Sequence, residues 1–326
     1  MENVASNVSA VKIAYLVLAH RYPEQLFRLI DRLETEQVYF FIHIDKRTDA
    51  AVYDAITRHF AGKSNVRFVK RFECYWAGFG IAQATLQGIK EIVESGLDVD
   101  YIALMSGQDY PIKTNAYIQQ FLQERCGTSF IEQLPYPHEK WDTENGGLDR
   151  VQKWHFVRKN FCHTYPDRDF LGNGRLRYLK PIWNKIRFHV PTFKRTFPLG
   201  MQPCGGAQFW CLHKKHFQHV YDFVHRHPDY VRFFKYVFVS DEILIQSIIG
   251  NAGFGSEIQN DTLHFLEWLR PGATLYTSDK EKIFSTYHLF ARKFDATVDE
   301  NIMDIIDREI LFANHTPATA MQTERG

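Results

Sequence analysis

The stretch KIAYLVLAH, Lys12 to His20, is a continuous apolar run that ends in a polar residue. Such a run is typical of a strand buried on both faces, as in a parallel sheet covered by helices. Pro23 suits the first turn of a following helix, and apolar residues recur after it at helical spacing. The stretch therefore predicts the strand–helix unit that begins an α/β fold.

The same alternation continues outward from this unit. Strand-like runs recur at VYFFIHID (Val38 to Asp45), NVRFV (Asn65 to Val69) and YIALMSGQD (Tyr101 to Asp109). A helical pattern separates the last two, with Ile81, Thr85, Ile89 and Ile92 on one face. This order favours an open, mostly parallel sheet flanked by helices.

In such sheets ligands bind beyond the carboxyl ends of the strands. The residues predicted at those ends are His20, Asp45, Tyr75 just after the third strand, and Asp109. Two acids and a histidine at this edge could form a binding or catalytic site. Strand ends also lead into polar loops as a matter of course, so position alone leaves both interpretations open.

The alternation of strand-like and helical patterns stops between residues 132 and 202, a segment rich in aromatic and basic side chains. Loops this long are uncommon unless they are functional or disordered, and the aromatic content argues against disorder. We interpret the segment as an irregular insertion that builds an acceptor surface. After it, GGAQFWCL (Gly205 to Leu212) predicts a strand, Lys214 to His227 a helix, and Val239 to Gly253 a helix with Ser240 at its N-cap.

Composition excludes some classes of protein. A net charge of +1 does not fit a general nucleic-acid binder, which needs a strong basic excess. The five cysteines are odd in number and widely spaced, so we expect no disulfide framework. The polar start MENVASNVSA does not resemble a secretory signal, and no apolar run reaches the ~18 residues of a membrane helix. We expect a cytoplasmic protein, with peripheral contact at the inner face of the membrane left open.

Motifs for metal and nucleotide chemistry are poorly placed or missing. Asp98-Val99-Asp100 has the D-x-D form, but it precedes a predicted strand and so lies at the end opposite the ligand. Asp167 and Asp169 lie in the irregular segment. No G-x-S-x-G, P-loop or G-x-G-x-x-G after a strand is present, which lowers hydrolase, NTPase and dehydrogenase interpretations.

Two further stretches contain candidate chemical groups. In VSDE, Glu242 is predicted in the first turn of a helix, where the dipole favours an ionised carboxylate suited to act as a general base. Acids also occur there simply to stabilise helices. Arg270 and Lys293 are cations in apolar surroundings. They could hold a diphosphate, or their stems could be buried while the charged heads reach water.

The chain resembles the core-2/I-branching N-acetylglucosaminyltransferases and the related peptide O-xylosyltransferases, glycosyltransferase family 14. The matching stretches occur in the family's order and span most of the chain: VLAH (17–20), FIHID (41–45), CYWAGFGIAQATL (74–86), LMSGQDYPIKTN (104–115), GGAQFW (205–210), VSDE (239–242) and HLFARKFD (288–295). The resemblance implies a GT-A-type fold, a UDP-sugar donor, inversion at the anomeric carbon and no metal or other cofactor.

The resemblance also implies roles for particular residues. Glu242 falls on the family's catalytic base, and Arg270 and Lys293, 23 positions apart, fall on its diphosphate-binding pair. The donor site then includes Val17, His20, Asp45, Tyr75 and Asp109. We give Arg292 no role at this point.

The domain organisation follows from the same resemblance. We expect a flexible lead at 1–10, a single domain at 11–315 and a frayed tail at 316–326. Within the domain, 11–130 is the nucleotide-binding half and 131–315 the acceptor and catalytic half.

Substrates and rival functions stay open at this level. The donor is UDP-GlcNAc, which we favour, or UDP-xylose, and the acceptor is a hydroxyl of a glycan or glycoconjugate, as in a bacterial cytoplasmic homologue. The alternatives are a non-catalytic nucleotide-sugar or glycan-binding module, a metal-dependent transferase that uses Asp109, and a hydrolase of nucleotide sugars.

Overall fold

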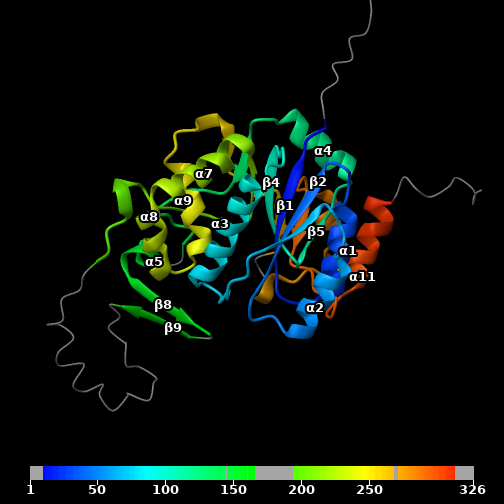
Figure 1. The fold of residues 1–326 in the computed structure, drawn as a ribbon, viewed down its shortest axis with the longest axis horizontal. Helices are drawn as coiled ribbons and strands as arrows, with labels where there is room; N and C mark the ends of the chain where they lie inside the picture. Colours follow the sequence, from blue (N-terminus) through cyan, green and yellow to red (C-terminus); the bar gives the residue numbers. More distant parts are fainter. Residues whose placement is uncertain are drawn as a thin grey trace, which may run out of the picture.

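The computed structural model describes residues 10–141, 143, 145–159, 161–165, 194–267 and 271–312. The predicted frayed tail and all of the predicted lead except Ala10 lie outside these ranges. Within them the chain forms an α/β structure, with helices on both sides of a central sheet (Figure 1).

The central sheet is mostly parallel, as predicted. β3 (Val66–Val69), β2 (Val38–Ile44), β1 (Ile13–Ala19) and β4 (Tyr101–Ser106) pair in parallel in that order. β11 (Trp210–His213) then runs antiparallel between β4 and β6 (Ser129–Ile131), and β12 (Ile258–Gln259) lies parallel to β6 at the edge.

Side chains of β1 alternate between two hydrophobic cores because successive strand residues point to opposite faces. Tyr15 and Val17 pack on the side of α1 (Pro23–Leu33), α2 (Ala50–His59), α4 (Asn115–Glu124) and α11 (Asn301–Ile306). Ala14 and Leu16 pack on the side of α3 (Phe79–Glu94), α7 (Lys214–Arg226) and α9 (Leu244–Gly250). The continuous apolar run of the sequence is thus explained by burial on both faces.

One glycine sets the distance between a helix and this strand. A Cβ built on Gly88 of α3 would lie 2.3 Å from Leu16 Cδ1. A glycine at this position therefore lets α3 pack closely against β1.

A second, three-stranded sheet places the segment HLFARKFD (288–295) next to the residues that follow β4. β14 (Phe290–Arg292) pairs in parallel with β13 (His264–Leu266) and antiparallel with β5 (Asp109–Pro111), with Arg292 opposite Asp109. Leu289, Phe290 and Phe294 are all buried, so the apolar residues of this segment anchor its backbone.

The described part of the insertion contains short elements. β7 (Leu134–Pro135) pairs with β10 (Cys204–Gly205), α5 (Asp149–Gln152) follows, and β8 (Trp154–Arg158) and β9 (Phe161–Tyr165) form a hairpin that projects at the lower left of Figure 1.

The other short elements of the described chain are η2 (Pro198–Gly200), α8 (Pro228–Phe233), η3 (Phe234–Tyr236), η5 (Gly255–Glu257), η6 (Pro271–Ala273), η7 (Thr277–Asp279), α10 (Lys280–Ser285) and the π-helical turn η8 (Asp307–Leu311).

The helix predicted over Val239 to Gly253 begins later than expected. Ser240–Glu242 is a separate 3-10 turn, η4, and α9 starts only at Leu244. Val239 takes a left-handed conformation, with φ 48°, and the side chain of Ser240 makes no capping hydrogen bond. The prediction that Glu242 occupies the first turn of an α-helix is therefore wrong, because Glu242 lies two residues before α9 begins.

All five cysteines are described, and none forms a disulfide, as expected. None of the described helices combines the length and the apolar character needed to cross a membrane.

Candidate active site

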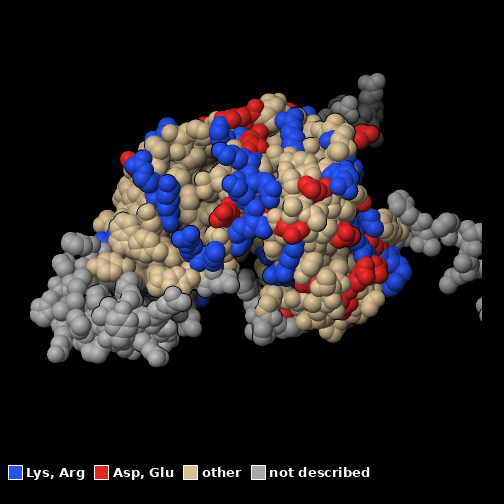
Figure 2. Space-filling view, turned by 60° about the horizontal axis from the view of Figure 1, so that its bottom comes forward, with Lys and Arg blue, Asp and Glu red and all other residues tan. Residues whose placement is uncertain are grey.

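Basic residues follow three successive parallel strands at their carboxyl ends. Arg21 comes after β1, Lys46 and Arg47 after β2, and Lys70 and Arg71 after β3. Figure 2, which turns this end of the molecule forward, shows a band of Lys and Arg side chains across a hollowed face. A chain of net charge +1 thus concentrates cations where an α/β sheet binds its ligand.

Asp45 and Tyr75 are brought together, as predicted, with Arg47 between them. The buried Asp45 carboxylate accepts hydrogen bonds from Arg47 Nη2 at 2.8 Å and from the Cys74 backbone N–H at 3.3 Å. The Arg47 guanidinium lies 4.1 Å from the centre of the Tyr75 ring. Burial would raise the pKa of Asp45, but its hydrogen bonds outweigh burial and the pKa is lowered, so this carboxylate is ionised at neutral pH.

Lys293 follows β14 and is a half-buried cation. Among the described residues, its ammonium group has no hydrogen-bond or ion-pair partner. Burial, together with the nearby charges of Arg21 and Arg292, lowers the pKa of Lys293. A partly desolvated cation close to other cations is stabilised when an anion binds beside it, so Lys293 is a candidate anion-binding residue.

The charges of both Lys293 and Asp45 act on His20. Partial burial lowers the pKa of His20, Arg21, Lys293 and Arg47 lower it further, and Asp45 opposes them. The ends of β1 and β2 and the segment after β14 therefore lie near His20, and a shared site built from them stays a prediction.

Asp109 has a different place from the one predicted. Its carboxylate is fully buried and accepts hydrogen bonds from the N–H and hydroxyl of Ser106, both at 2.7 Å. His264 Nε2 lies 3.4 Å and Arg292 Nε 3.5 Å from its oxygens. These partners leave no oxygen open to a donor or a metal, so the predicted direct contact is corrected to a positioning role for Arg292.

Val17 and Arg270 are the two other residues predicted for the donor site. The side chain of Val17 is fully buried in β1, so it does not face a ligand. Arg270 lies outside the described residues. The chain is described again from Pro271, and there Ala273 and Leu275 exchange backbone hydrogen bonds with Lys293, at 3.1 and 2.9 Å.

Glu242 is held in its short turn from two sides. The Gly206 backbone N–H donates to the Glu242 carbonyl at 2.9 Å, and Arg150 Nη1 donates to the Glu242 carboxylate at 3.3 Å. The side chain is 29% exposed. Burial raises the pKa of Glu242 and Arg150 opposes that rise. A carboxylate with a raised pKa that still reaches solvent is well suited to take up a proton.

Contacts link Glu242 to both groups of cations. On one side, the β3–α3 loop joins Asp45 to the turn before Glu242, because Cys74 N–H donates to Asp45 and Val239 N–H donates to the Ala77 carbonyl at 3.0 Å. On the other side, Gly206 begins the segment that reaches Phe209, whose ring lies 3.8 Å from the Arg292 guanidinium. Segments far apart in sequence thus surround one region of the molecule.

With this geometry in place, the comparisons with known proteins become informative. The family model described as "Core-2/I-Branching enzyme" matches residues 13–289. The chain belongs to the core-2/I-branching enzyme family of glycosyltransferases. The matched range includes every described site residue named above except Arg292 and Lys293.

Curated relatives of this family member are similar at low identity. Xylosyltransferase 2 of Mus musculus is 23% identical over 337 residues, which cover 95% of this chain and 35% of the relative. Xylosyltransferase oxt of Drosophila melanogaster is 24% identical, covering 80% of this chain and 27% of the relative. The family member thus spans about a third of the length of these proteins.

Solved structures show a weaker likeness. An active-site mutant of LgtC is 12% identical, with a TM-score of 0.38 and 86% of each chain covered. The mannosyltransferase Ktr4p from S. cerevisiae is also 12% identical, with a TM-score of 0.35, 76% of this chain and 68% of that chain covered.

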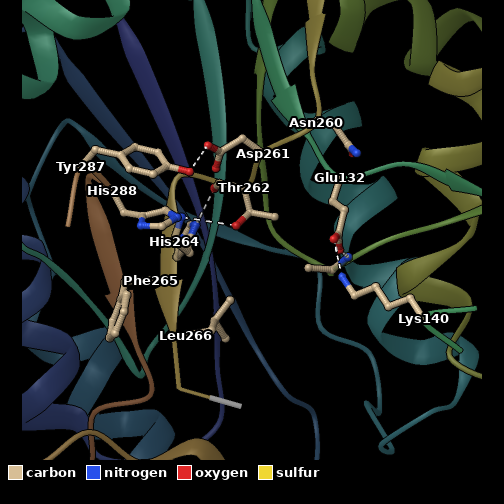
Figure 3. A pocket seen from close by; sticks show the side chains of 11 residues that line it. Glu132, Lys140, Asn260, Asp261, Thr262, His264, Phe265, Leu266, Tyr287 and His288 are labelled. Atoms are coloured by element: carbon tan, nitrogen blue, oxygen red, sulfur yellow. Dashed lines mark hydrogen bonds and ion pairs between the residues drawn. The ribbon is translucent and has the colours of Figure 1, made fainter. Parts of the chain in front are cut away.

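A hollow of about 370 Å³ lies between Glu132 and strand β13 in this core-2/I-branching family member (Figure 3). Glu132, in its wall, accepts a hydrogen bond from the Ala207 N–H at 2.8 Å, next to the Gly206 that holds Glu242. Lys140 contacts Glu132. The other polar lining comes from Asn260, Asp261, Thr262, His264, Tyr287 and His288.

The D-x-D motif lies where the sequence predicted. Asp98 and Asp100 precede β4, at its amino end. Asp98 pairs with Lys12 at 3.3 Å and Lys214 at 2.9 Å, and Asp100 accepts from the Lys12 backbone N–H. These contacts are structural ones. Asp167 and Asp169 lie outside the described residues.

Sequence reasoning missed several residues of this region. Arg150 comes from a four-residue helix inside the irregular segment, where no periodicity marks it. Arg47 and Phe209 lie in stretches that matched the family or flanked its motifs, yet neither was assigned a role. The available signal was the recurrence of basic residues after each of the first three strands.

Replacing Arg150 with Gln should move the acid limb of the activity profile to higher pH. A general base works when ionised, and Arg150 lowers the pKa of Glu242 against the effect of burial. Without Arg150 the pKa rises, so activity is lost at a higher pH as acid is added and recovers at alkaline pH. The kcat profile measures this, with Arg58→Gln on the exposed end of α2 as control. A loss of equal size at every pH would contradict it.

Proposed function

We propose that this chain is an inverting, metal-independent glycosyltransferase that moves a sugar from a UDP-sugar to a hydroxyl group of a glycan or glycoconjugate. The observation that carries the proposal is Lys293, a half-buried cation without a partner among the described residues, next to other cations at the carboxyl edge of the sheet. A diphosphate would supply the missing negative charge.

The proposed reaction is a single in-line displacement. Glu242 takes the proton of the acceptor hydroxyl as its oxygen bonds to the anomeric carbon of the donor sugar. The bond from that carbon to the diphosphate oxygen breaks on the opposite face, and its electron pair stays on UDP. Lys293 and Arg270 stabilise the charge that grows there, the work that a divalent ion does in other transferases.

In this proposal the nucleoside lies over the ends of β1 and β2. Asp45, Tyr75 and His20 line that place, and Arg47 fixes the first two relative to each other. Asp45 is ionised and already hydrogen-bonded, and the Tyr75 ring is partly exposed. The uracil and ribose would meet one carboxylate, one aromatic ring and one imidazole.

The hollow lined by Glu132 is the proposed acceptor site. It offers carboxylate, amide, hydroxyl and imidazole groups together with the ring of Phe265, a mixture that suits hydrogen bonding to sugar hydroxyls. Its wall residue Glu132 and the base Glu242 are tied to adjacent residues, Ala207 and Gly206. An acceptor bound there would lie between Glu132 and β13, whose residue Leu266 pairs with Arg292.

A panel of nucleotide sugars in metal-free buffer tests the donor. We expect UDP-GlcNAc to raise the melting temperature most, with UDP-xylose as the competing outcome and UDP-galactose and UDP-glucose weaker, because ligands that bind the native state stabilise it by RT ln(1 + [L]/Kd). Transfer should continue in EDTA. Loss of turnover in EDTA, restored by a divalent ion, would overturn metal independence.

The same panel separates the alternatives. A non-catalytic binding module of this family would show the thermal shift but release no UDP in the presence of any acceptor. A nucleotide-sugar hydrolase would release free sugar without an acceptor. A cytoplasmic location, including the inner face of the membrane, is part of the proposal.

A further inference from the structure

Arg21 is a second cation at the edge of the donor site that no motif assigned. It follows β1 directly after His20, and its side chain is 40% exposed. Its Nε is buried and has no hydrogen-bond partner among the residues that the structure describes. A buried, unpaired N–H of a charged group is costly, so tertiary contacts hold this guanidinium where it is.

Those contacts are specific. Arg21 Nη2 donates to Gln108 Oε1 at 3.0 Å, and the Tyr22 ring lies 4.5 Å from the guanidinium carbon. Gln108 is itself buried, and its amide donates to the Phe294 carbonyl at 3.1 Å. Because the Phe294 N–H donates back to the Gln108 carbonyl at 2.8 Å, one glutamine ties Arg21 to the residue that follows Lys293.

The carboxylates near Arg21 and Lys293 already have other hydrogen-bond or ion-pair partners. Asp45 pairs with Arg47, and Asp109 lies against Arg292. Asp295 accepts from the Tyr22 hydroxyl at 2.9 Å and from Thr297, and it lies 4.0 Å from Arg21 Nη2, at the limit of an ion pair. Arg21 lowers the pKa of Lys293, so the two cations act on each other without a carboxylate fully neutralising either.

We propose that Arg21 binds the diphosphate of the donor together with Lys293, and that Gln108 is the positioning residue that holds its guanidinium in place. A guanidinium fixed before the ligand arrives loses little conformational entropy on binding, and its planar fork suits phosphate oxygens. This inference rests on the proposed UDP-sugar function and adds to it a cation from the first strand.

Binding of UDP, UMP and uridine to the full chain, measured by calorimetry in metal-free buffer, tests the assignment. Arg21→Gln should weaken UDP binding by about 10–100-fold, the usual loss for a charge-assisted hydrogen bond, and leave uridine binding unchanged. Arg21→Lys should recover part of the loss because the charge remains. Gln108→Leu should weaken UDP binding by a smaller factor and also leave uridine unchanged. Arg58→Gln, an exposed arginine on α2, is the matched control.

The outcomes separate this inference from the proposal beneath it. If the wild type and Lys293→Gln show that UDP binding depends on Lys293, but Arg21→Gln binds UDP like the wild type, Arg21 has no part in the site. Equal losses for UDP and uridine in Arg21→Gln would show a structural role and overturn the assignment as well. If the wild type binds neither UDP nor any UDP-sugar, the proposed function itself fails.

Discussion

Replacing Glu242 with Gln should reduce sugar transfer by about 10²–10⁴-fold, the usual contribution of a general base, while UDP binding stays close to that of the wild type. The amide keeps the shape of the side chain and its place beside Arg150 but does not accept the proton of the acceptor hydroxyl. Because Glu242 is placed on the acceptor side of the reacting carbon, the loss should appear in kcat. Single-turnover transfer assays and UDP calorimetry measure the two quantities.

Glu281→Gln is the matched control for this experiment. Glu281 is an exposed glutamate on α10 whose side chain makes no hydrogen bond or ion pair among the described residues, so transfer should be unaffected. A Glu242→Gln protein that loses UDP binding together with transfer would show that Glu242 supports the structure of the site. One that keeps full activity would move the base to another residue.

Replacing Lys293 with Gln should affect both halves of the donor chemistry. UDP binding should weaken by about 10–100-fold because a charged partner of the phosphates is lost. The kcat should fall by a further ~10²–10³-fold, since charge grows on the diphosphate as the glycosidic bond breaks. Wild-type binding should also weaken at a lower alkaline pH than for an ordinary lysine, because the pKa of Lys293 is lowered.

Lys293→Arg and Lys235→Gln sharpen the result. An arginine stays charged at alkaline pH, so Lys293→Arg should bind UDP without the alkaline loss. Lys235 is an exposed lysine in η3, and its replacement should leave UDP binding and turnover unchanged. Unchanged UDP binding and turnover in Lys293→Gln would show that Lys293 does not bind the diphosphate and would contradict the proposed function.

Much of the fold could be predicted from local patterns. The apolar runs at β1, β2 and β4 and the helical spacing in α3 gave the parallel part of the sheet, because burial on both faces demands continuous apolar residues. The reversed strand β11 and the small sheet of β5, β13 and β14 left no such signal. Their partners are up to ~180 residues apart in sequence, and pairing between distant segments is a property of the packed chain.

The candidate site divides in the same way. Strand-end reasoning placed Asp45, Tyr75 and His20 correctly at one edge. It failed for Asp109, which a short antiparallel pairing carries into the interior beside Arg292. It also failed for the environment of Glu242, since burial raises the pKa of a carboxylate that a helix dipole was expected to keep ionised.

The sequence by itself determined the α/β class, the end of the sheet where a ligand is expected, and the motifs that mark the family. These follow from hydrophobic periodicity and from residues adjacent in the chain. Only the tertiary structure decided which charged groups pair with other groups of the protein and which could pair with a substrate. Asp109 begins β5 and Lys293 follows β14. Within the described ranges the carboxylate has partners and the ammonium group has none, because pairing depends on what distant segments bring to each atom.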